Sequence, residues 1–197
     1  MPRPTSIGDK QTKQLALLSA NGVPVSRQYV IDSGTYDFWY SSRRGEATTG
    51  IKPSVFLHFE NKGGQLGIPL PAGVVRVYAP DSSGAAQFVG EDAVRHTAKG
   101  EKVELRLGEA FDITADKTQI QYKVIGDKTR QATYRIEIRN AGDEAVTVHV
   151  REGLHGDWQI LAESQPHTQE NSNRIAWDVI VPGSGKTVLD YTALITW

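Results

Sequence analysis

The side chains most able to do chemistry are five histidines, and they are scattered along the chain. No two of them form an HxH, HxxxH or HExxH motif, the spacings that bring zinc ligands together locally. His58 and Glu60 are two residues apart on an expected strand, so they share a face and could bind a metal or act as acid and base. The more common role of such a pair is a solvent-facing or partly buried strand pair. The histidines are residues 58, 96, 149, 155 and 167.

Two of the histidines have clearer expected positions. His149 alternates with Val148 and Val150 and is therefore expected to point into solvent. His155 lies between glycines just before Trp158, which predicts a loop histidine.

Acidic residues form two sets that could meet at loops and bind calcium through their carboxylates. Neither set contains a DxDxDG calcium loop, so solvated loop acids are the more common alternative. The sets are Asp112, Asp116 and Asp127, and Glu152, Asp157 and Glu163.

The nucleophile and cofactor motifs of enzymes are missing from the sequence. The chain has no cysteine, which excludes disulfides, thiolate metal sites and cysteine nucleophiles. Residues 183–187, GSGKT, contain the end of a phosphate-binding motif. They lack its upstream glycine, and an alternating strand follows, so they predict a hairpin turn. We therefore assign no catalytic residue, no metal ligand and no cofactor.

The strongest binding candidate is the aromatic segment 35–41 with the two arginines that follow it. Exposed rings on a β-strand can stack on sugars or anchor a protein partner, and the arginines add charge. The alternative is a strand that is buried on both faces. The predicted binding residues are Tyr36, Trp39, Tyr40, Arg43 and Arg44.

Length and charge limit the class of protein. The 197 residues suit one large domain or two small β domains, and the net charge is −1. Because no basic stripe is present, a nucleic-acid partner has no electrostatic support. No apolar run is long enough to span a membrane or to form a signal peptide. We expect either a cytoplasmic protein or a fragment of a longer exported protein.

Alternating apolar residues predict an all-β protein. In the first half we expect strands over residues 13–19 and 23–31, joined by the turn at Asn21-Gly22, and a strand over 53–61. Residues 70–92 read as strand, turn and strand, with Val75 and Val77 on one face and Arg76 on the other.

The second half repeats the pattern more regularly, with apolar residues at alternate positions and short connections. This favours about six antiparallel strands in a fibronectin- or immunoglobulin-like β-sandwich. We therefore predict two packed sandwich-like units, residues 1–110 and 111–197. The expected inward-facing residues include Tyr134, Ile136, Ile138, Val146, Val148, Val150, Ile175, Trp177, Val179, Val181, Leu189, Tyr191, Ala193, Ile195 and Trp197.

Four blocks of sequence carry a family resemblance: residues 7–18 (IGDKQTKQLALL), 70–92 (LPAGVVRVYAPDSSGAAQFVGED), 105–116 (LRLGEAFDITAD) and 150–160 (VREGLHGDWQI). Together they resemble the C-terminal β domain of the mucoidy-inhibitor-A-like proteins, a domain catalogued as of unknown function. The resemblance implies a bacterial envelope or periplasmic protein with β-sandwich modules. It implies no catalytic residue.

These observations favour a non-catalytic structural or protein-interaction module. Its partner would be another protein or an envelope polysaccharide. One alternative is a carbohydrate-binding or accessory module acting on that polysaccharide. The other is a hydrolase or metal site that uses His58 and Glu60 or the loop acids.

Overall fold

The computed structural model of the chain is all-β, as the sequence predicts. It describes residues 18–35, 47–63 and 66–197, together with residues 6, 8–12, 14 and 16, and in these residues there are thirteen strands and no helix. The strands are β1 (Ser26–Thr35), β2 (Ala47–Ile51), β3 (Ser54–Glu60), β4 (Gly73–Pro80), β5 (Ala86–Val94), β6 (Lys102–Glu109), β7 (Ile113–Val124), β8 (Thr129–Asn140), β9 (Val146–Gly153), β10 (Asp157–Glu163), β11 (Thr168–Asn171), β12 (Arg174–Val181) and β13 (Gly185–Thr196).

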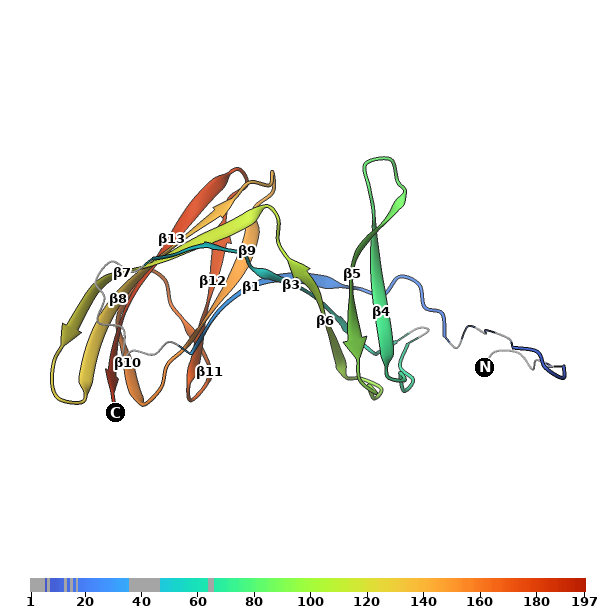
Figure 1. Cartoon of the computed structure of the whole chain (residues 1–197), viewed down its shortest axis with the longest axis horizontal. Coiled ribbons are helices and arrows are strands. Elements are labelled where there is room, and N and C mark those ends of the chain that lie inside the picture. Colours follow the sequence, from blue (N-terminus) through green and yellow to red (C-terminus); the bar gives the residue numbers. More distant parts are fainter. Residues whose placement is uncertain are drawn as a thin grey trace. The chain divides into compact units, whose positions relative to one another are not determined.

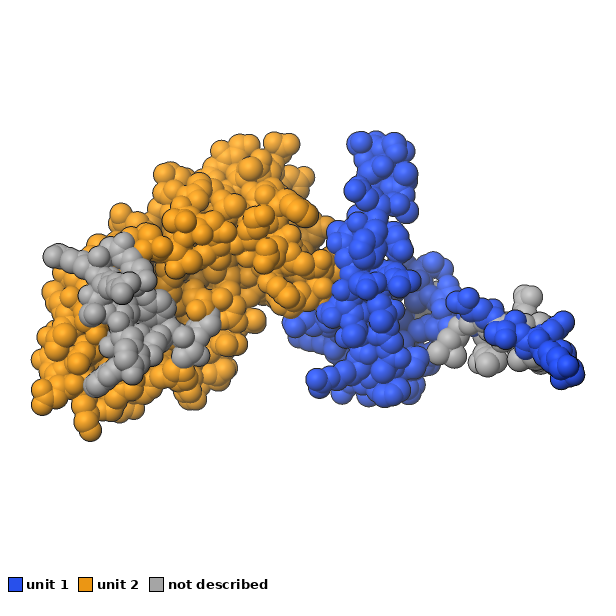
Figure 2. All heavy atoms as spheres, viewed as in Figure 1, with its two compact units in different colours: residues 1–26, 57–105 blue, residues 27–56, 106–197 orange. Residues whose placement is uncertain are grey.

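The chain divides into two compact units, which are coloured separately in Figure 2. Unit 1 contains residues 1–26 and 57–105, and unit 2 contains residues 27–56 and 106–197. This division differs from the predicted one at 110/111, because residues 27–56 belong with the C-terminal strands. The reason is a long-range parallel pairing of β1 with β9, in which Tyr29 lies opposite Val148 and Ile31 opposite Val150.

Two sheets form a sandwich in unit 2 (Figure 1). One has the strand order β11-β12-β9-β1-β3-β6 and the other the order β10-β13-β8-β7-β2. Residues 57–60 of β3 and 102–105 of β6 are assigned to unit 1. Strands that follow each other in sequence often lie in opposite sheets, as β8 and β9 do, and also β12 and β13. The GSGKT segment therefore leads from one sheet to the other and is not the hairpin turn that the sequence predicted.

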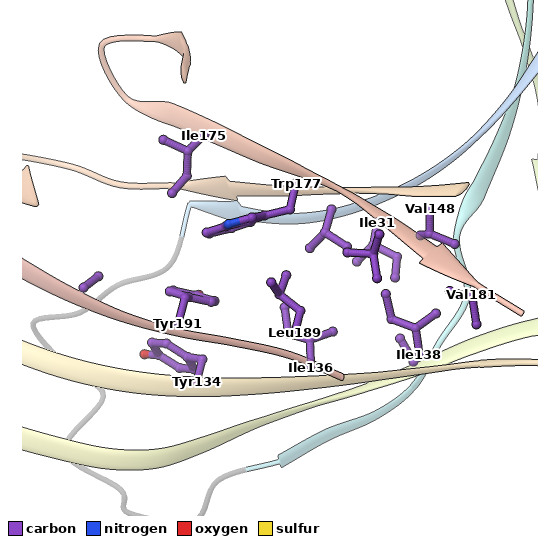
Figure 3. Packing of buried hydrophobic residues seen from close by; sticks show 14 of the residues in the cluster. Ile31, Tyr134, Ile136, Ile138, Val148, Ile175, Trp177, Val181, Leu189 and Tyr191 are labelled. Carbon is purple, nitrogen blue, oxygen red and sulfur yellow. The ribbon is translucent and has the colours of Figure 1, made fainter. Parts of the chain in front are cut away.

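The core of unit 2 contains most of the residues predicted to point inward, together with others such as Ile31, Ile113 and Leu154. Ile136 and Leu189 come from one sheet, Val148 and Trp177 from the other, and their side chains meet between the sheets (Figure 3). All four are at most 1% exposed. Period-two alternation buries one face of each strand, so the facing rows exclude water from the space between them. Trp197 is the exception among the predicted residues, since it is 37% exposed.

One local prediction is wrong. The expected hairpin over residues 13–31 is absent, because residues 18–25 and the described positions 14 and 16 are not in a strand. The Asn21-Gly22 turn is therefore not flanked by paired strands. The strands of the second half pair with one another antiparallel, as predicted, and the one parallel neighbour of β9 is β1 from the first half.

The sandwich is confirmed, but its strand order differs from that of immunoglobulins. If β7 to β13 are lettered A to G, the observed sheets are A-B-G-D and C-F-E. The immunoglobulin order is A-B-E-D and C-F-G. The last strand, β13, lies between β8 and β10, where the immunoglobulin order has its fifth strand.

Unit 1 contains a two-stranded sheet, β4 with β5, which matches the predicted strand–turn–strand block. One face of this hairpin carries Val74, Tyr78 and Phe88, which are 62%, 56% and 52% exposed. The rings of Tyr78 and Phe88 meet edge to face at 5.7 Å. On the same face Arg76 pairs with Glu91 at 2.9 Å.

A buried asparagine holds the base of unit 1 together. Asn61 is fully buried, and its Nδ2 donates to the carbonyl oxygens of Ile68 at 2.7 Å and Ala98 at 2.9 Å. Its Oδ1 accepts the backbone N–H of Gly67 at 3.0 Å. One side chain thus adds hydrogen bonds to two segments that are otherwise joined by the isolated bridge between Leu70 and Thr97.

Candidate functional site

The predicted binding residues Tyr36, Trp39, Tyr40, Arg43 and Arg44 lie outside the described residues. The segment lies between β1, which ends at Thr35, and β2, which begins at Ala47. These two strands belong to different sheets. The role of the segment stays a prediction from sequence.

The His58 and Glu60 side chains each engage a different neighbour. His58 Nδ1 lies 3.6 Å from Glu104 Oε2 on β6. The Glu60 carboxylate pairs with Lys62, and that hydrogen bond holds the pKa of Glu60 below its usual value. This arrangement resembles a solvent-facing strand pair more than an acid–base pair.

The loop acids are spread along strands rather than gathered at one end of the sandwich. Asp112 and Asp127 flank β7, whose rise separates them by about 40 Å. Asp116 lies on β7 itself and accepts the N–H of Gly50 and a hydrogen bond from Arg139, both at 2.8 Å. These two bonds lower the pKa of Asp116. Over the described ranges, no three acidic or histidine side chains are placed to hold a metal ion.

An ion pair inside unit 2 was not foreseen. Lys117 Nζ on β7 lies 2.7 Å from both carboxylate oxygens of Glu152 on β9, and the two side chains are 7% and 1% exposed. The pair therefore links the two sheets across the core. Lys117 Nζ also lies 4.8 Å from the ring centroid of Tyr134, a cation–π contact. The alternation along β7 could have predicted that Lys117 is buried, because it lies on the same face of the strand as the buried Ile113 and Ala115.

Aromatic rings continue from this ion pair through the core. Tyr134 stacks on Tyr191 with centroids 5.4 Å apart, and Tyr191 lies 4.8 Å from Trp177 (Figure 3). Trp177 is fully buried, as the sequence predicts. Trp158 packs partly buried against the same core, and its indole N–H donates to the Ser172 carbonyl at 2.8 Å.

The carboxylate of Glu163 contacts the last ring of this aromatic row, Trp177. Glu163 Oε2 accepts the indole N–H of Trp177 at 2.9 Å and lies 2.9 Å from His167 Nδ1. The His167 ring is edge to face with both Trp177 and Trp158. A buried indole N–H needs an acceptor, and Glu163 supplies it. The contacts of Glu163 and His167 therefore hold the two tryptophans in place, which is a structural role.

His149 is not in open solvent, contrary to the prediction. Its side chain is 12% exposed, with Nδ1 at 2.6 Å from Asp178 and Nε2 at 3.1 Å from Glu170. Glu170 also accepts a hydrogen bond from Arg151 at 3.0 Å. Burial raises the pKa of Glu170, but the bonds from His149 and Arg151 outweigh it, and the net pKa is lowered. The cluster ties the edge strand β11 to β12 and β9. His155 is an exposed loop residue, as expected.

The glycines of GSGKT serve close packing of two turns. A Cβ on Gly183 would collide with the backbone carbonyl of Asp143, which belongs to the turn after β8. The two turns are also joined by the bond from Ser184 N–H to the Gly142 carbonyl at 2.7 Å. Lys186 Nζ pairs with Glu137 at 2.9 Å. This motif is therefore explained by packing between sheets.

Comparison of the chain with protein-family models, with curated proteins and with solved structures found no match. In the described part of the chain, no helix has the length and apolar character needed to cross a membrane.

Proposed function

We propose that this chain is a non-catalytic structural or protein-interaction module of a bacterial envelope protein. We also propose that it corresponds to the C-terminal β domain of the mucoidy-inhibitor-A-like proteins. The sequence blocks quoted above support the second statement, and the all-β fold is compatible with it. The fibronectin-like description is not carried forward, because of the strand order.

One observation carries the proposal: the described side chains best suited to chemistry already hold the fold together. Glu152 joins the two sheets through Lys117, Glu163 holds the indole of Trp177, and His149 joins two carboxylates on neighbouring strands. A catalytic site needs a base or nucleophile that faces a place for substrate. The bonds of these groups to one another and to the fold support a structural role for them.

The metal-site alternative is tested by thermal unfolding of the whole chain with EDTA and with added Zn²⁺, Ca²⁺ or Mg²⁺. The proposal predicts the same unfolding midpoint in all conditions. A midpoint that rises by several degrees and saturates at micromolar metal would reject it, because ligand binding stabilises the native state by mass action.

The interaction role is tested at the segment that the sequence singled out. Replacement of Trp39 and Tyr40 by alanine is expected to weaken binding to a purified native partner while the unfolding midpoint stays unchanged. A large loss of thermal stability would instead show that these rings belong to the core. Loss of binding to an envelope polysaccharide on Trp39→Ala would favour the carbohydrate-binding alternative.

A further inference from the structure

We propose that β4 is a dimerisation edge, at which the hairpin of one chain pairs antiparallel with β4 of a second copy to form a four-stranded sheet. The inference rests on the proposed function, since it names the partner of an interaction module. It starts from the β4–β5 sheet, which has only two strands. Isolated two-stranded sheets are marginal in water, and a free strand edge is a template for another strand.

The two edges of the hairpin are not equivalent. On β5 the pairing shifts between Gly90 and Phe88, so that Val89 is an extra residue that bulges out of the ladder. A bulge bends a strand and interrupts the regular spacing that a new neighbour needs. β5 also carries the adjacent acids Glu91 and Asp92, whereas Arg76 is the only charged residue of β4. The edge open to strand addition is therefore that of β4.

The outer face of the hairpin favours an apolar and uncharged partner. Val74 and Tyr78 are more than half exposed, and Arg76 and Glu91, which lie on the same face, neutralise each other. A highly charged partner would find no net charge to complement. A second β4 strand has the same apolar character and brings backbone groups to an edge that no other described strand occupies.

The sequence of β4 selects one register for the pair. Residues directly opposite in an antiparallel pair point to the same face of the sheet. The two-fold axis that relates the two copies is perpendicular to the sheet and keeps each residue on its face, so it must pass through a residue position and not between two residues. Within the bounds Gly73–Pro80, the longest overlaps place that axis at Arg76 or at Val77. An axis at Arg76 sets two arginines directly opposite each other, which is unfavourable.

An axis at Val77 sets no like charges directly opposite each other. It sets Arg76 of each copy opposite Tyr78 of the other, a cross-strand cation–π pair that occurs twice by symmetry. Val75 then lies opposite Ala79, and Val74 opposite Pro80, which lacks an N–H and lies at the end of the overlap. This register is the one that we assign to the dimer.

The test is sedimentation equilibrium of the full chain between about 10 µM and about 1 mM, a range suited to a small interface. The weight-average mass is expected to rise from 21.6 kDa towards twice that value as the concentration increases. Tyr78→Arg places an arginine opposite each Arg76 and is expected to abolish the rise. Tyr78→Glu offers a carboxylate to the same arginines and is expected to keep or strengthen it.

Phe88→Arg is the matched control. It removes the same Tyr78–Phe88 ring contact and adds the same charge to the exposed face, but on β5. It is expected to retain the dimer, and circular dichroism of each variant reports whether the chain keeps the strand content of the parent. A monomer at every concentration, a dimer that survives Tyr78→Arg, or a dimer that Phe88→Arg also abolishes would each overturn the proposed edge.

Failure of this dimer is distinguishable from failure of the proposed function. A monomeric chain whose unfolding midpoint ignores added metal ions rejects only the β4 edge. A chain that is stabilised by micromolar metal rejects the proposed function, whatever its oligomeric state. Binding of a polysaccharide that competes with the dimer would show that the exposed rings serve a sugar and would overturn the dimer as the role of this surface.

Discussion

The buried ion pair of unit 2 makes the sharpest prediction about stability. Lys117→Met removes the cation and leaves the Glu152 carboxylate, 1% exposed, without its partner between the sheets. Loss of one member of a buried pair costs about 3–5 kcal/mol, because the remaining charge cannot regain its hydration. Domains of this kind are stable by about 5–15 kcal/mol in total, so the variant should lose a large fraction of its stability.

The double variant Lys117→Met/Glu152→Leu is expected to lose much less stability than the single variant. With both charges gone, the site becomes apolar and stays filled, and the cost should fall to about 1 kcal/mol or less. The difference between the double variant and the sum of the single variants measures the coupling of the pair. We expect that coupling to be about 3 kcal/mol or more.

Urea unfolding followed by tryptophan fluorescence is the assay, because the fully buried Trp177 reports on the core of unit 2. The control is the exposed pair Arg135–Asp190, whose bonds of 2.8 and 2.9 Å are nearly as short but lie in solvent. Arg135→Met should leave the unfolding midpoint close to that of the parent. If Lys117→Met also changes little, the reasoning about a dry, sheet-bridging pair is refuted.

Three further predictions concern the turns and the surface. Asn61→Ala should destabilise unit 1 by about 1–3 kcal/mol for each backbone group left without a partner, measured as faster amide hydrogen exchange at residues 61–70 and 97–101. Gly183→Ala should cost about 1–3 kcal/mol in urea unfolding, because its Cβ would meet the Asp143 carbonyl, and an unchanged midpoint would contradict the packing of the two turns. The pKa values of Asp116 and Glu137 are lowered by hydrogen bonds, so their stabilisation is complete above about pH 5 and is lost as the pH falls through the folded-state values. Thermal midpoints recorded from about pH 6 to about pH 2 should therefore fall at the acid end, and a flat profile would contradict this account.

Much of the fold follows from period-two patterning. Tyr134, Ile136, Trp177 and Leu189 were expected in the core from alternation alone, and all are buried. Alternation shows which face of a strand is apolar and therefore which residues are buried. It does not show which strands pair. The β4–β5 hairpin was also foreseen, since its turn residues are local in sequence.

Pairing between distant strands could not be predicted in the same way. Nothing in residues 26–35 specifies β9 as a parallel neighbour, and nothing at 182–184 distinguishes a hairpin from a turn between sheets. The environment of His149 was missed for a related reason. Its partners Asp178 and Glu170 come from β12 and β11, and only the register of these strands brings the three together.

The central claim is that the reactive side chains of this chain serve its fold, and Glu163 tests it most directly. The measurement is the free energy of unfolding of Glu163→Met relative to the parent chain. Loss of the acceptor for the Trp177 indole N–H predicts a decrease of about 1–3 kcal/mol. Side chains kept for activity often cost stability, so an equally stable or more stable variant would contradict the claim.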